Sequence, residues 1–230
     1  MSTAALLLIG AGSGRVAVPI GQAPWRGLAR VQTELGERCT GFLIAPDVAV
    51  TAAHCLFLPR VGHFIRPDSV HVLLRYSMGR FAAEARVARF VIASSYDPRR
   101  EQATASADRA VLLLDHAIGG PGDAIALAHH LPAVGERLLL AGYGQDRDEL
   151  AVRGPPCRIT SVLADAIGGV VIAHDCAATL GTSGAPLLAP AGDGTWRAVG
   201  VQIEARVGAL GGRAAWLLGA ATRSGSSSGR

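Results

Sequence analysis

Short runs of aliphatic and β-branched residues recur along the whole chain, each bounded by Gly, Pro or Asp, and helical periodicity is scarce. Runs of this kind predict strands, and several short strands in succession indicate an all-β barrel or sandwich. No period of roughly 20 to 50 residues repeats, so a solenoid or propeller is not supported. We predict strands at residues 41–44, 48–51, 70–75, 86–92, 110–114, 137–142, 157–163, 169–173, 185–188 and 198–203.

The chain is long enough for one large domain or two small ones. It has 230 residues, of which 50% are hydrophobic and 17% charged, so most of it is expected to fold. The stretch AIGGPGD at 117–123 is the best linker, because it is rich in Gly and divides the chain about equally. We expect a flexible lead-in or signal remnant over 1–15, one barrel over 16–122, a second over 123–223, and a disordered tail over 224–230.

No segment predicts a membrane span or a nucleotide site. Apolar runs such as 4–9 and 110–114 are far shorter than the roughly 20 residues that a spanning helix needs, so no membrane partner is expected. The start of the chain has a short apolar stretch but no basic segment before it, which makes it a poor or truncated secretion signal. Gly10–Gly14 imitates a dinucleotide-binding turn, but Pro19 and Pro24 follow where such a turn needs a helix.

The charge pattern does not favour nucleic-acid binding. The net charge is +4, but all 22 basic residues are Arg and are spread along the chain, and aromatic residues make up only 5%. Neither a basic block nor a stacking platform results, so no nucleic-acid partner is expected.

Four cysteines, Cys39, Cys55, Cys157 and Cys176, form one close pair in each half of the chain. They contain no C-x-x-C motif, so zinc is an unfavourable interpretation and no metal site is predicted. An even count with two local pairs indicates disulfides Cys39–Cys55 and Cys157–Cys176, and hence a secreted or periplasmic protein. Four free thiols in a cytosolic protein are the alternative.

Three polar residues stand at distinctive positions. His54 lies in TAAHC directly after an apolar strand, Ser183 lies in GTSGAP, and Asp108 immediately precedes the strand at 110–114. Taken alone, each has an ordinary explanation as a structural histidine, a turn serine or a strand-cap aspartate. Small residues around Ser183 leave its hydroxyl and nearby amides accessible, and an inward Asp can fix a histidine tautomer. Together the three predict nucleophilic catalysis.

These segments resemble the trypsin-like (chymotrypsin-fold) serine peptidases, and their order His, Asp, Ser is that of the family. TAAHC, DRAVLLL at 108–114, SYD at 95–97, LAGYG at 140–144 and GTSGAP all look like family motifs, in the family's order. The position of SYD makes Asp108, rather than Asp97, the match to the catalytic acid. The resemblance extends from about residue 15 to residue 203.

The resemblance implies two antiparallel Greek-key β-barrels with the active site in the cleft between them. By the family's catalytic mechanism, Ser183 would be the nucleophile, His54 the general base, and Asp108 the acid that orients His54. The amides of Gly181 and Ser183 would form the oxyanion hole. A polypeptide is then the substrate, the chemistry needs no cofactor, and the sequence does not specify an oligomeric state.

Departures from the family pattern bear on activation and specificity. Thr182 stands where many members have an aspartate that receives a freed N-terminal amine, so we expect activity without that ion pair, as in bacterial relatives of the glutamyl endopeptidase type. Ala177, six residues before Ser183, lacks the acid of tryptic pockets. Ile203 and Glu204 are further candidate pocket residues, and His174 is taken as structural. We favour a small or apolar residue before the cleaved bond, the P1 position.

Two other functions remain open. A catalytically weak or inactive binding module on the same fold is the main alternative, since fold does not guarantee activity. An α/β-hydrolase esterase would need Gly-x-Ser-x-Gly and the order Ser, acid, His, which this chain lacks.

Overall fold

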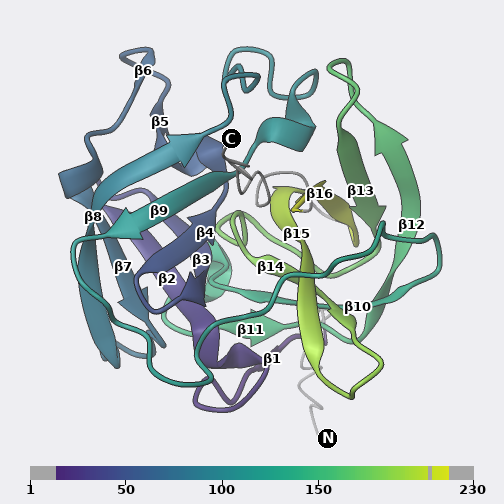
Figure 1. The fold of residues 1–230 in the computed structure, drawn as a ribbon, viewed down its shortest axis with the longest axis horizontal. Helices are drawn as coiled ribbons and strands as arrows, with labels where there is room; N and C mark the ends of the chain where they lie inside the picture. Colours follow the sequence, from purple (N-terminus) through teal and green to yellow (C-terminus); the bar gives the residue numbers. More distant parts are fainter. Residues whose placement is uncertain (1–13, 207–208, 218–230) are drawn as a thin grey trace, which may run out of the picture.

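The computed structural model describes residues 14–206 and 209–217. Most of the predicted lead-in, the Gly-rich stretch up to residue 13 and the predicted tail over 224–230 lie outside these ranges. The described part is built almost entirely of antiparallel strands (Figure 1). Its helices are single 3₁₀ turns: η1 (Trp25–Gly27), η2 (Ala53–Leu56), η3 (Pro67–Ser69), η4 (Ala105–Ala107) and η5 (Gln145–Arg147).

Six strands of the N-terminal half close into a barrel in the order β2-β3-β4-β9-β8-β7. Strand β7 returns to pair with β2 after the β2-β3-β4 meander, which is a Greek-key connection. The strands are β2 (Leu28–Thr33), β3 (Arg38–Ala45), β4 (Val48–Thr51), β7 (Val70–Leu74), β8 (Ala83–Ile92) and β9 (Ala110–Leu114). A small hairpin, β5 (Phe57–Leu58) with β6 (His63–Phe64), lies outside the barrel.

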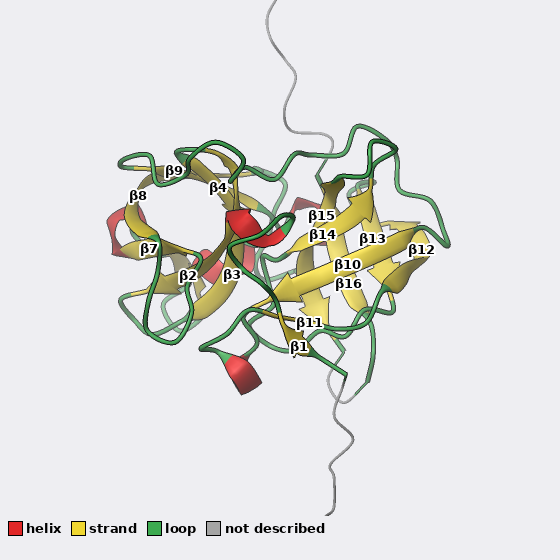
Figure 2. Ribbon diagram, turned by 90° about the horizontal axis from the view of Figure 1, so that it is seen from below, coloured by secondary structure: helices red, strands yellow, loops and turns green. Residues whose placement is uncertain are grey.

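The C-terminal half forms a second barrel of the same kind beside the first (Figure 2). Its sheet runs β10-β12-β13-β16-β15-β14, and β14 pairs again with β10, which closes the ring. These strands are β10 (Arg137–Gly142), β12 (Cys157–Ala164), β13 (Val170–His174), β14 (Pro186–Pro190), β15 (Trp196–Ala205) and β16 (Gly212–Trp216). Two short strands, β1 (Val16–Ala17) and β11 (Val152–Arg153), extend the sheet from β10. The predicted fold class is confirmed.

The buried apolar side chains form three clusters that follow this architecture. One fills the first barrel around Leu74 and Leu112, and another fills the second around Leu138 and Ile172. The third joins the barrels, since it contains Phe42 and Val50 of the first together with residues of the second such as Leu188 and Val201. The contact between the barrels is therefore a hydrophobic core in its own right, which fixes one half of the molecule against the other.

Each of the ten predicted strands is present; the ends of 48–51, 110–114 and 137–142 are as predicted, and those of the others differ by at most three residues. Alternation explains why: in β9, Ala110, Leu112 and Leu114 are buried while Val111 and Leu113 are only half-buried. The sequence did not predict β2 or β16, nor the two-residue strands β1, β5, β6 and β11. Strand β2 carries a buried arginine, Arg30, in its middle, and β16 is largely Ala and Gly, so neither shows a strand pattern.

The connection between the barrels runs from residue 115 to residue 136 and contains the predicted linker at 117–123. It is fastened to the first barrel by Asp123, a buried carboxylate that accepts hydrogen bonds from Arg75 Nη1 at 2.7 Å and Arg26 Nε at 3.1 Å. Val16–Ala17, the start of the predicted N-terminal barrel, pairs with β11 on the side of the second barrel. None of the helices in the described ranges is long and apolar enough to cross a membrane.

Candidate active site

The pairing of β4 with β9 brings His54 and Asp108 together. These strands are antiparallel and Thr51 is opposite Ala110, so the residues just beyond Thr51 face those just before Ala110. His54 lies there in η2, and Asp108 lies in the bend between η4 and β9. The Asp108 carboxylate accepts from the His54 backbone N–H at 2.9 Å and from His54 Nδ1 at 2.7 Å. Each acceptor oxygen holds a different part of the same residue.

The carboxylate sets the protonation pattern of His54. Asp108 is buried, and because a carboxylate only accepts, it holds the proton on Nδ1 and leaves Nε2 of the neutral ring as the free base. Burial alone would lower the pKa of His54, but the hydrogen bond and negative charge of Asp108, with a smaller contribution from Glu101, raise the pKa above its ordinary 6.5. The His54 side chain remains 26% exposed, so the ring is accessible from outside.

Two successive turns lead into and contain Ser183, which is the second residue of the second turn. In the first, the 179–182 turn, Thr182 N–H donates to Thr179 O at 3.1 Å, and in the second Ala185 N–H donates to Thr182 O at 3.0 Å. Gly181 and Gly184 are the third residues of these turns, with φ of 91° and 86°. A type II turn requires such a φ at its third residue, which is why both positions are glycine. Ser183 itself is half-buried.

The peptide between Leu180 and Gly181 has a fixed orientation. Its carbonyl, Leu180 O, accepts from the Gln145 backbone N–H at 2.7 Å. Because the C=O and N–H of a trans peptide point in opposite directions, the Gly181 N–H points away from Gln145. Within the ranges that the structure describes, neither the Gly181 nor the Ser183 amide donates to a protein acceptor.

Contacts from the first barrel hold this loop beside the histidine segment. Thr40 N–H donates to Ser183 O at 2.8 Å, and Thr40 Oγ1 donates to Gly181 O at 3.0 Å. Thr51 Oγ1 in turn donates to Thr40 O at 2.7 Å. A Cβ on Gly184 would lie 2.0 Å from Thr40 O and 3.1 Å from the backbone N of Ala52, two residues before His54. The serine loop thus packs directly on the end of β4, just before His54.

No hydrogen bond joins the Ser183 hydroxyl to His54 among the described residues. In enzymes without substrate this bond is often long or poorly aligned and forms only when substrate binds. Thr40, which organises the approach of the two loops, was not among the residues that the sequence predicted. Its only signal was its place in a strand beside Cys39.

Both predicted disulfides are confirmed, and no described cysteine is free. Cys39–Cys55 ties η2, and so His54, to β3. Cys157–Cys176 ties the start of β12 to the segment that leads to the serine loop. The sulfur atoms of Cys39 and Cys55 and a ring nitrogen of His54 all lie within 4.8 Å of one another, a spacing that could hold a metal ion. Their bond to each other removes both thiolates as ligands.

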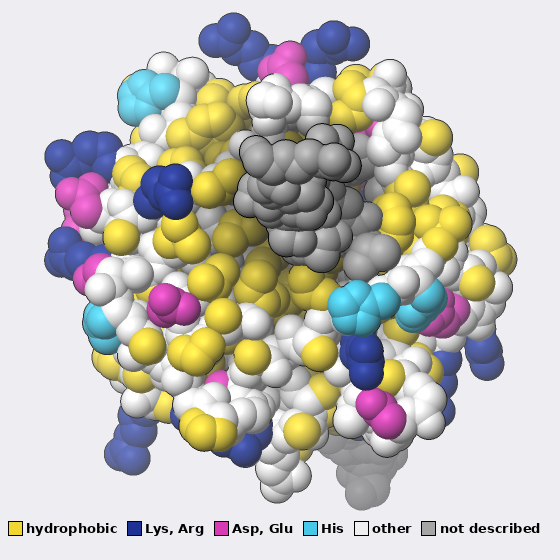
Figure 3. Space-filling model, in the orientation of Figure 1, with side chains coloured by type: hydrophobic (Ala, Val, Ile, Leu, Met, Phe, Trp, Pro, Cys, Tyr) yellow, Lys and Arg dark blue, Asp and Glu magenta, His cyan; other side chains and the backbone are white. Residues whose placement is uncertain are grey.

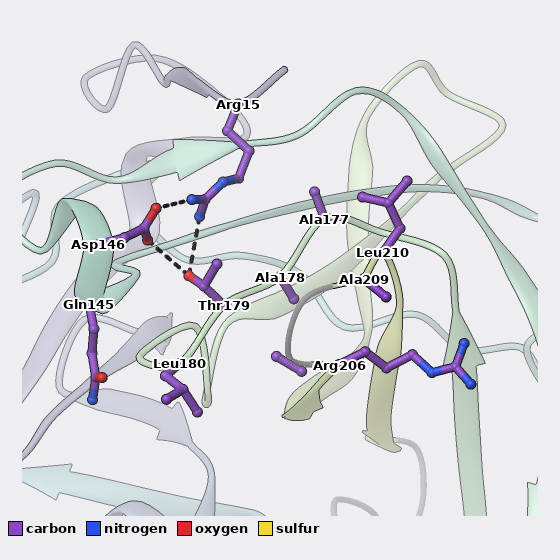
Figure 4. A pocket seen from close by; sticks show the side chains of 11 residues that line it. Arg15, Gln145, Asp146, Ala177, Ala178, Thr179, Leu180, Arg206, Ala209 and Leu210 are labelled. Atoms are coloured by element: carbon purple, nitrogen blue, oxygen red, sulfur yellow. Dashed lines mark hydrogen bonds and ion pairs between the residues drawn. The ribbon is translucent and has the colours of Figure 1, made fainter. Parts of the chain in front are cut away.

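A cavity of about 520 Å³ adjoins the serine loop (Figure 4). Most of its wall is small or apolar: Ala177, Ala178, Leu180, Ala205, Ala209 and Leu210. Its charged members are Arg206, which is exposed, and a linked pair, Arg15 and Asp146. Of the predicted pocket residues, Ala177 lines this cavity.

The other two predicted pocket residues have interior or strand-edge contacts. Ile203 packs in the core between the barrels. The Glu204 carboxylate accepts from Arg213 Nε at 2.7 Å on the neighbouring strand. His174 is buried, with Nε2 2.7 Å from Gln202 Oε1 and Nδ1 accepting from Cys176 N–H at 3.2 Å. Burial lowers the pKa of His174 to about 4, so this ring is neutral near pH 7.

Thr182 contributes a buried hydroxyl and no charge to the loop. Its Oγ1 donates to Thr179 O at 2.6 Å, the carbonyl that also receives the Thr182 N–H. The side chain therefore reinforces the 179–182 turn from within.

A double β-barrel with a His–Asp pair in one half and a glycine-flanked serine in the other defines a two-barrel, peptidase-type protein. The family model described as Trypsin matches residues 13–202, and the chain therefore belongs to the trypsin family. Among solved structures it is similar to a chain titled "Structure of Glu endopeptidase in complex with MPD". That match has a TM-score of 0.73 and 20% identity, and covers 90% of this chain and 93% of the other. Among curated proteins, none matches this chain.

Proposed function

We propose that this protein is a serine endopeptidase that cleaves peptide bonds through His54, Asp108 and Ser183. The observation that carries the proposal is the pair of hydrogen bonds between His54 and Asp108, together with the packing of the serine loop on the end of β4 just before His54. The pair leaves His54 Nε2 as a base, and a base within reach of a serine hydroxyl activates that serine as a nucleophile.

The reaction follows from these positions. Ser183 Oγ attacks the carbonyl carbon of the scissile bond while His54 Nε2 accepts the hydroxyl proton. The tetrahedral intermediate collapses when His54 returns that proton to the leaving amine, so that the C–N bond breaks and an acyl ester remains on Ser183. Water, deprotonated by His54, then hydrolyses the ester and restores the hydroxyl. Asp108 keeps its charge throughout and stabilises the imidazolium.

The free amides of Gly181 and Ser183 stabilise the oxygen that becomes negative in both tetrahedral intermediates. The Gly181 N–H points away from Gln145 and has no protein acceptor in the described part of the chain. Losing one donor of this kind typically costs roughly 2.7 to 4 kcal/mol of transition-state stabilisation. The steps use only side chains, backbone amides and water.

We propose a small or apolar P1 residue. The cavity beside Leu180 is lined mainly by Ala and Leu, its carboxylate Asp146 is paired with Arg15, and Glu204 is paired with Arg213. No unpaired acid is thus offered to a basic P1 side chain in the described wall. The matched Glu endopeptidase shares the fold, and at 20% identity its name carries no specificity to this chain. If the enzyme instead preferred an acidic P1 side chain, Arg206 is the exposed cation in the cavity wall that would pair with it.

We also propose that the protein is secreted or periplasmic and active without an ion pair at position 182. Both disulfides require an oxidising compartment to form and persist. The neutral Thr182 hydroxyl already bonds Thr179 O, and it offers no charge to an N-terminal amine.

Labelling with a fluorophosphonate probe tests the mechanism. We expect label on Ser183 in the wild type, and none in His54→Ala or Ser183→Ala, because the hydroxyl is unreactive without its base. A peptide library cleaved by the wild type then gives the P1 preference. A folded wild type that neither labels nor cleaves would favour the binding-module alternative. Cleavage mainly after Glu or Asp would overturn the proposed P1 preference alone.

A further inference from the structure

Side chains that the proposed mechanism does not use hydrogen-bond to the 179–182 turn through Thr179. Arg15 Nη1 donates to Thr179 Oγ1 at 3.1 Å, and Thr179 Oγ1 donates to Asp146 Oδ1, also at 3.1 Å. Arg15 Nη2 pairs with Asp146 Oδ2 and closes the triangle (Figure 4). Three segments far apart in the sequence meet here: the residues before β1, the η5 turn and the serine loop.

This cluster is built into the protein. The Arg15 side chain is only 7% exposed, although a lone surface arginine would extend into water, whereas the Asp146 side chain is 44% exposed. Burial alone would raise the pKa of Asp146, but its hydrogen bond and charge interaction with Arg15 lower that pKa below 3.8. The carboxylate is therefore ionised at neutral pH and compensated by the guanidinium.

Gly144 provides the space for the cluster. A Cβ at that position would lie 2.3 Å from Thr179 Oγ1, 2.6 Å from Asp146 Oδ1 and 3.3 Å from Arg15 Nη1, so it would meet all three members. Its φ of −78° is ordinary, so this glycine is required by close approach and not by backbone conformation.

The grip acts on both halves of the turn. The side chain of Asp146 holds Thr179, and the backbone N–H of Gln145, the preceding residue in η5, holds Leu180 O. Thr179 O in turn accepts both bonds from Thr182, and Leu180 O sets the direction of the Gly181 N–H. Movement of η5 relative to Thr179 would therefore rotate the peptide that carries this amide.

We propose that Arg15 and Asp146 are positioning residues for the 179–182 turn: as a pair they clamp Thr179 and hold the Gly181 amide in the orientation that stabilises the oxyanion. Arg15 also cancels the charge of Asp146, which would otherwise oppose negative charge developing nearby. The inference rests on the proposed peptidase function and adds to it the residues that keep the oxyanion hole formed.

The test compares kcat, KM and binding of a tetrahedral-adduct inhibitor, a peptide boronic acid, in Arg15→Gln, Arg15→Lys and Asp146→Asn. Coupled contacts of this kind are worth roughly 0.5 to 3 kcal/mol, so Arg15→Gln is expected to lower kcat about tenfold. The boronic acid should bind about tenfold more weakly, while KM changes less, because the amide contacts only the tetrahedral state. Arg15→Lys keeps the charge but offers one nitrogen in place of two, so its kcat should lie between those of Arg15→Gln and the wild type.

A double variant separates positioning from general destabilisation. Arg15→Gln leaves the Asp146 carboxylate unpaired, so Arg15→Gln combined with Asp146→Asn should be more active than Arg15→Gln alone. Arg197→Gln is the matched control, since Arg197 pairs with Asp193 in the β14–β15 hairpin and should leave kcat unchanged. Gly144→Ala, which displaces the cluster without altering its charge, covers the case in which an Arg15 variant does not fold.

The outcomes are distinct. Wild type that labels at Ser183, with Arg15→Gln within twofold of it in kcat and boronic-acid affinity, would overturn the inference and leave the peptidase proposal standing. An equal loss of kcat in Arg197→Gln would also overturn it. So would a higher KM and a lower Tm in Arg15→Gln with unchanged inhibitor affinity. Wild type that neither labels nor cleaves would overturn the proposed function, and this inference with it.

Discussion

The two halves of the candidate active site are held in different ways. His54 and Asp108 bond directly to each other, and one strand pairing, β4 with β9, accounts for their approach. The loop of Ser183 is instead held by neighbours from several places, namely Thr40 of the first barrel, Gln145 of η5 and Gln202 of β15. The His54–Asp108 pair is thus a property of one barrel, whereas the position of Ser183 depends on how the two barrels meet.

Because of this difference, a mutation can alter the pKa of His54 or the position of Ser183 separately. A change in the first barrel that spares Asp108 can leave the pKa of His54 intact and still displace Ser183. On the face drawn in Figure 3 the arginines are scattered, mostly around the periphery. Loss of interdomain hydrogen bonds should therefore appear first in kcat.

The largest effect is expected from Asp108→Asn. The amide cannot hold the Nδ1 proton as a carboxylate does, and the comparable change in such triads lowers kcat roughly 10⁴-fold. Asp108 raises the pKa of His54, and the neutral ring is the base, so wild-type kcat/KM should rise with pH through a value above 6.5. In the variant the residual activity should rise at lower pH, as pH-rate profiles of both proteins would show.

Asp97→Asn is the control for that experiment, because Asp97 lies in the same loop and, in the part of the chain that the structure describes, its carboxylate accepts only from the nearby Arg99 N–H. It should keep the wild-type profile. If Asp97→Asn lost activity and Asp108→Asn retained it, the assignment of the catalytic acid would be wrong.

Removal of either disulfide should have the next largest effect, a decrease in the free energy of unfolding. The bridged residues are 16 and 19 apart, and loops of this size are worth roughly 3 kcal/mol of unfolding free energy each in the chain-entropy model. For a chain of this size that corresponds to a Tm lower by roughly 6 to 12 °C. Scanning calorimetry of the Cys→Ser double variants, with and without reductant for the wild type, measures it.

The two bridges should differ in their effect on the active site. Loss of Cys39–Cys55 loosens η2 and should move the pH profile, because it frees His54 from β3. Loss of Cys157–Cys176 should lower kcat without moving the profile, because it acts on the segment before Ser183. Melting that is indifferent to reductant would contradict a structural role for both bridges, and with it the argument for an oxidising compartment.

Thr40→Val tests the dependence of the nucleophile on the first barrel. The buried hydroxyl donates to Gly181 O at 3.0 Å and accepts from Tyr143 N–H at 2.8 Å, so the variant leaves two buried backbone groups unpaired. Such groups cost roughly 1 to 3 kcal/mol, and we expect kcat to fall about tenfold. The pH profile should not move, because no hydrogen bond joins Thr40 to His54 or Asp108 in the described ranges.

Thr40→Ser keeps the hydroxyl and should restore most of kcat. A shifted pH profile in Thr40→Val would show that the two halves are coupled through this residue, which would remove the distinction drawn above.

The contrast between the halves also explains what the sequence could and could not predict. Strands, the strand-end positions of His54 and Asp108, and the turn at Ser183 all leave local patterns, such as TAAHC or GTSGAP, and these were found. The contacts that hold the serine loop join residues far apart: 141 positions separate Thr40 from Gly181, and 164 separate Arg15 from Thr179. No local pattern marks such residues.

The missed strand β2 has a similar cause. Arg30 would be unfavourable inside a strand by itself, but its guanidinium lies 4.1 Å from the centre of the Tyr76 ring and pairs with Glu149. Those partners come from other parts of the chain, so the burial of Arg30 follows from tertiary structure and not from its own segment.

Asp165 tests whether the acid–base pair is as independent of the second barrel as its direct bonds imply. This carboxylate lies just beyond β12 and accepts from the Ser106 N–H at 2.8 Å, in the η4 turn that leads to Asp108. A Cβ on Gly169, in the same hairpin, would lie 1.9 Å from Ser106 Oγ, so the two barrels are in close contact here too.

Asp165→Asn should be the mildest of these changes. Burial alone would raise the pKa of Asp165, but hydrogen bonds from Ser106, Gly169 and Ile167 lower it below 3.8. The ionised group therefore stabilises the fold above pH 3.8 and loses this contribution as the pH falls through its folded pKa. Urea unfolding should show wild type more stable than Asp165→Asn by about 1 kcal/mol near pH 7, with the gap narrowing below pH 3.8. Since His54 and Asp108 keep their mutual bonds, kcat should change by less than about threefold; a larger loss with a displaced pH profile would mean that the pair is held in place from both barrels.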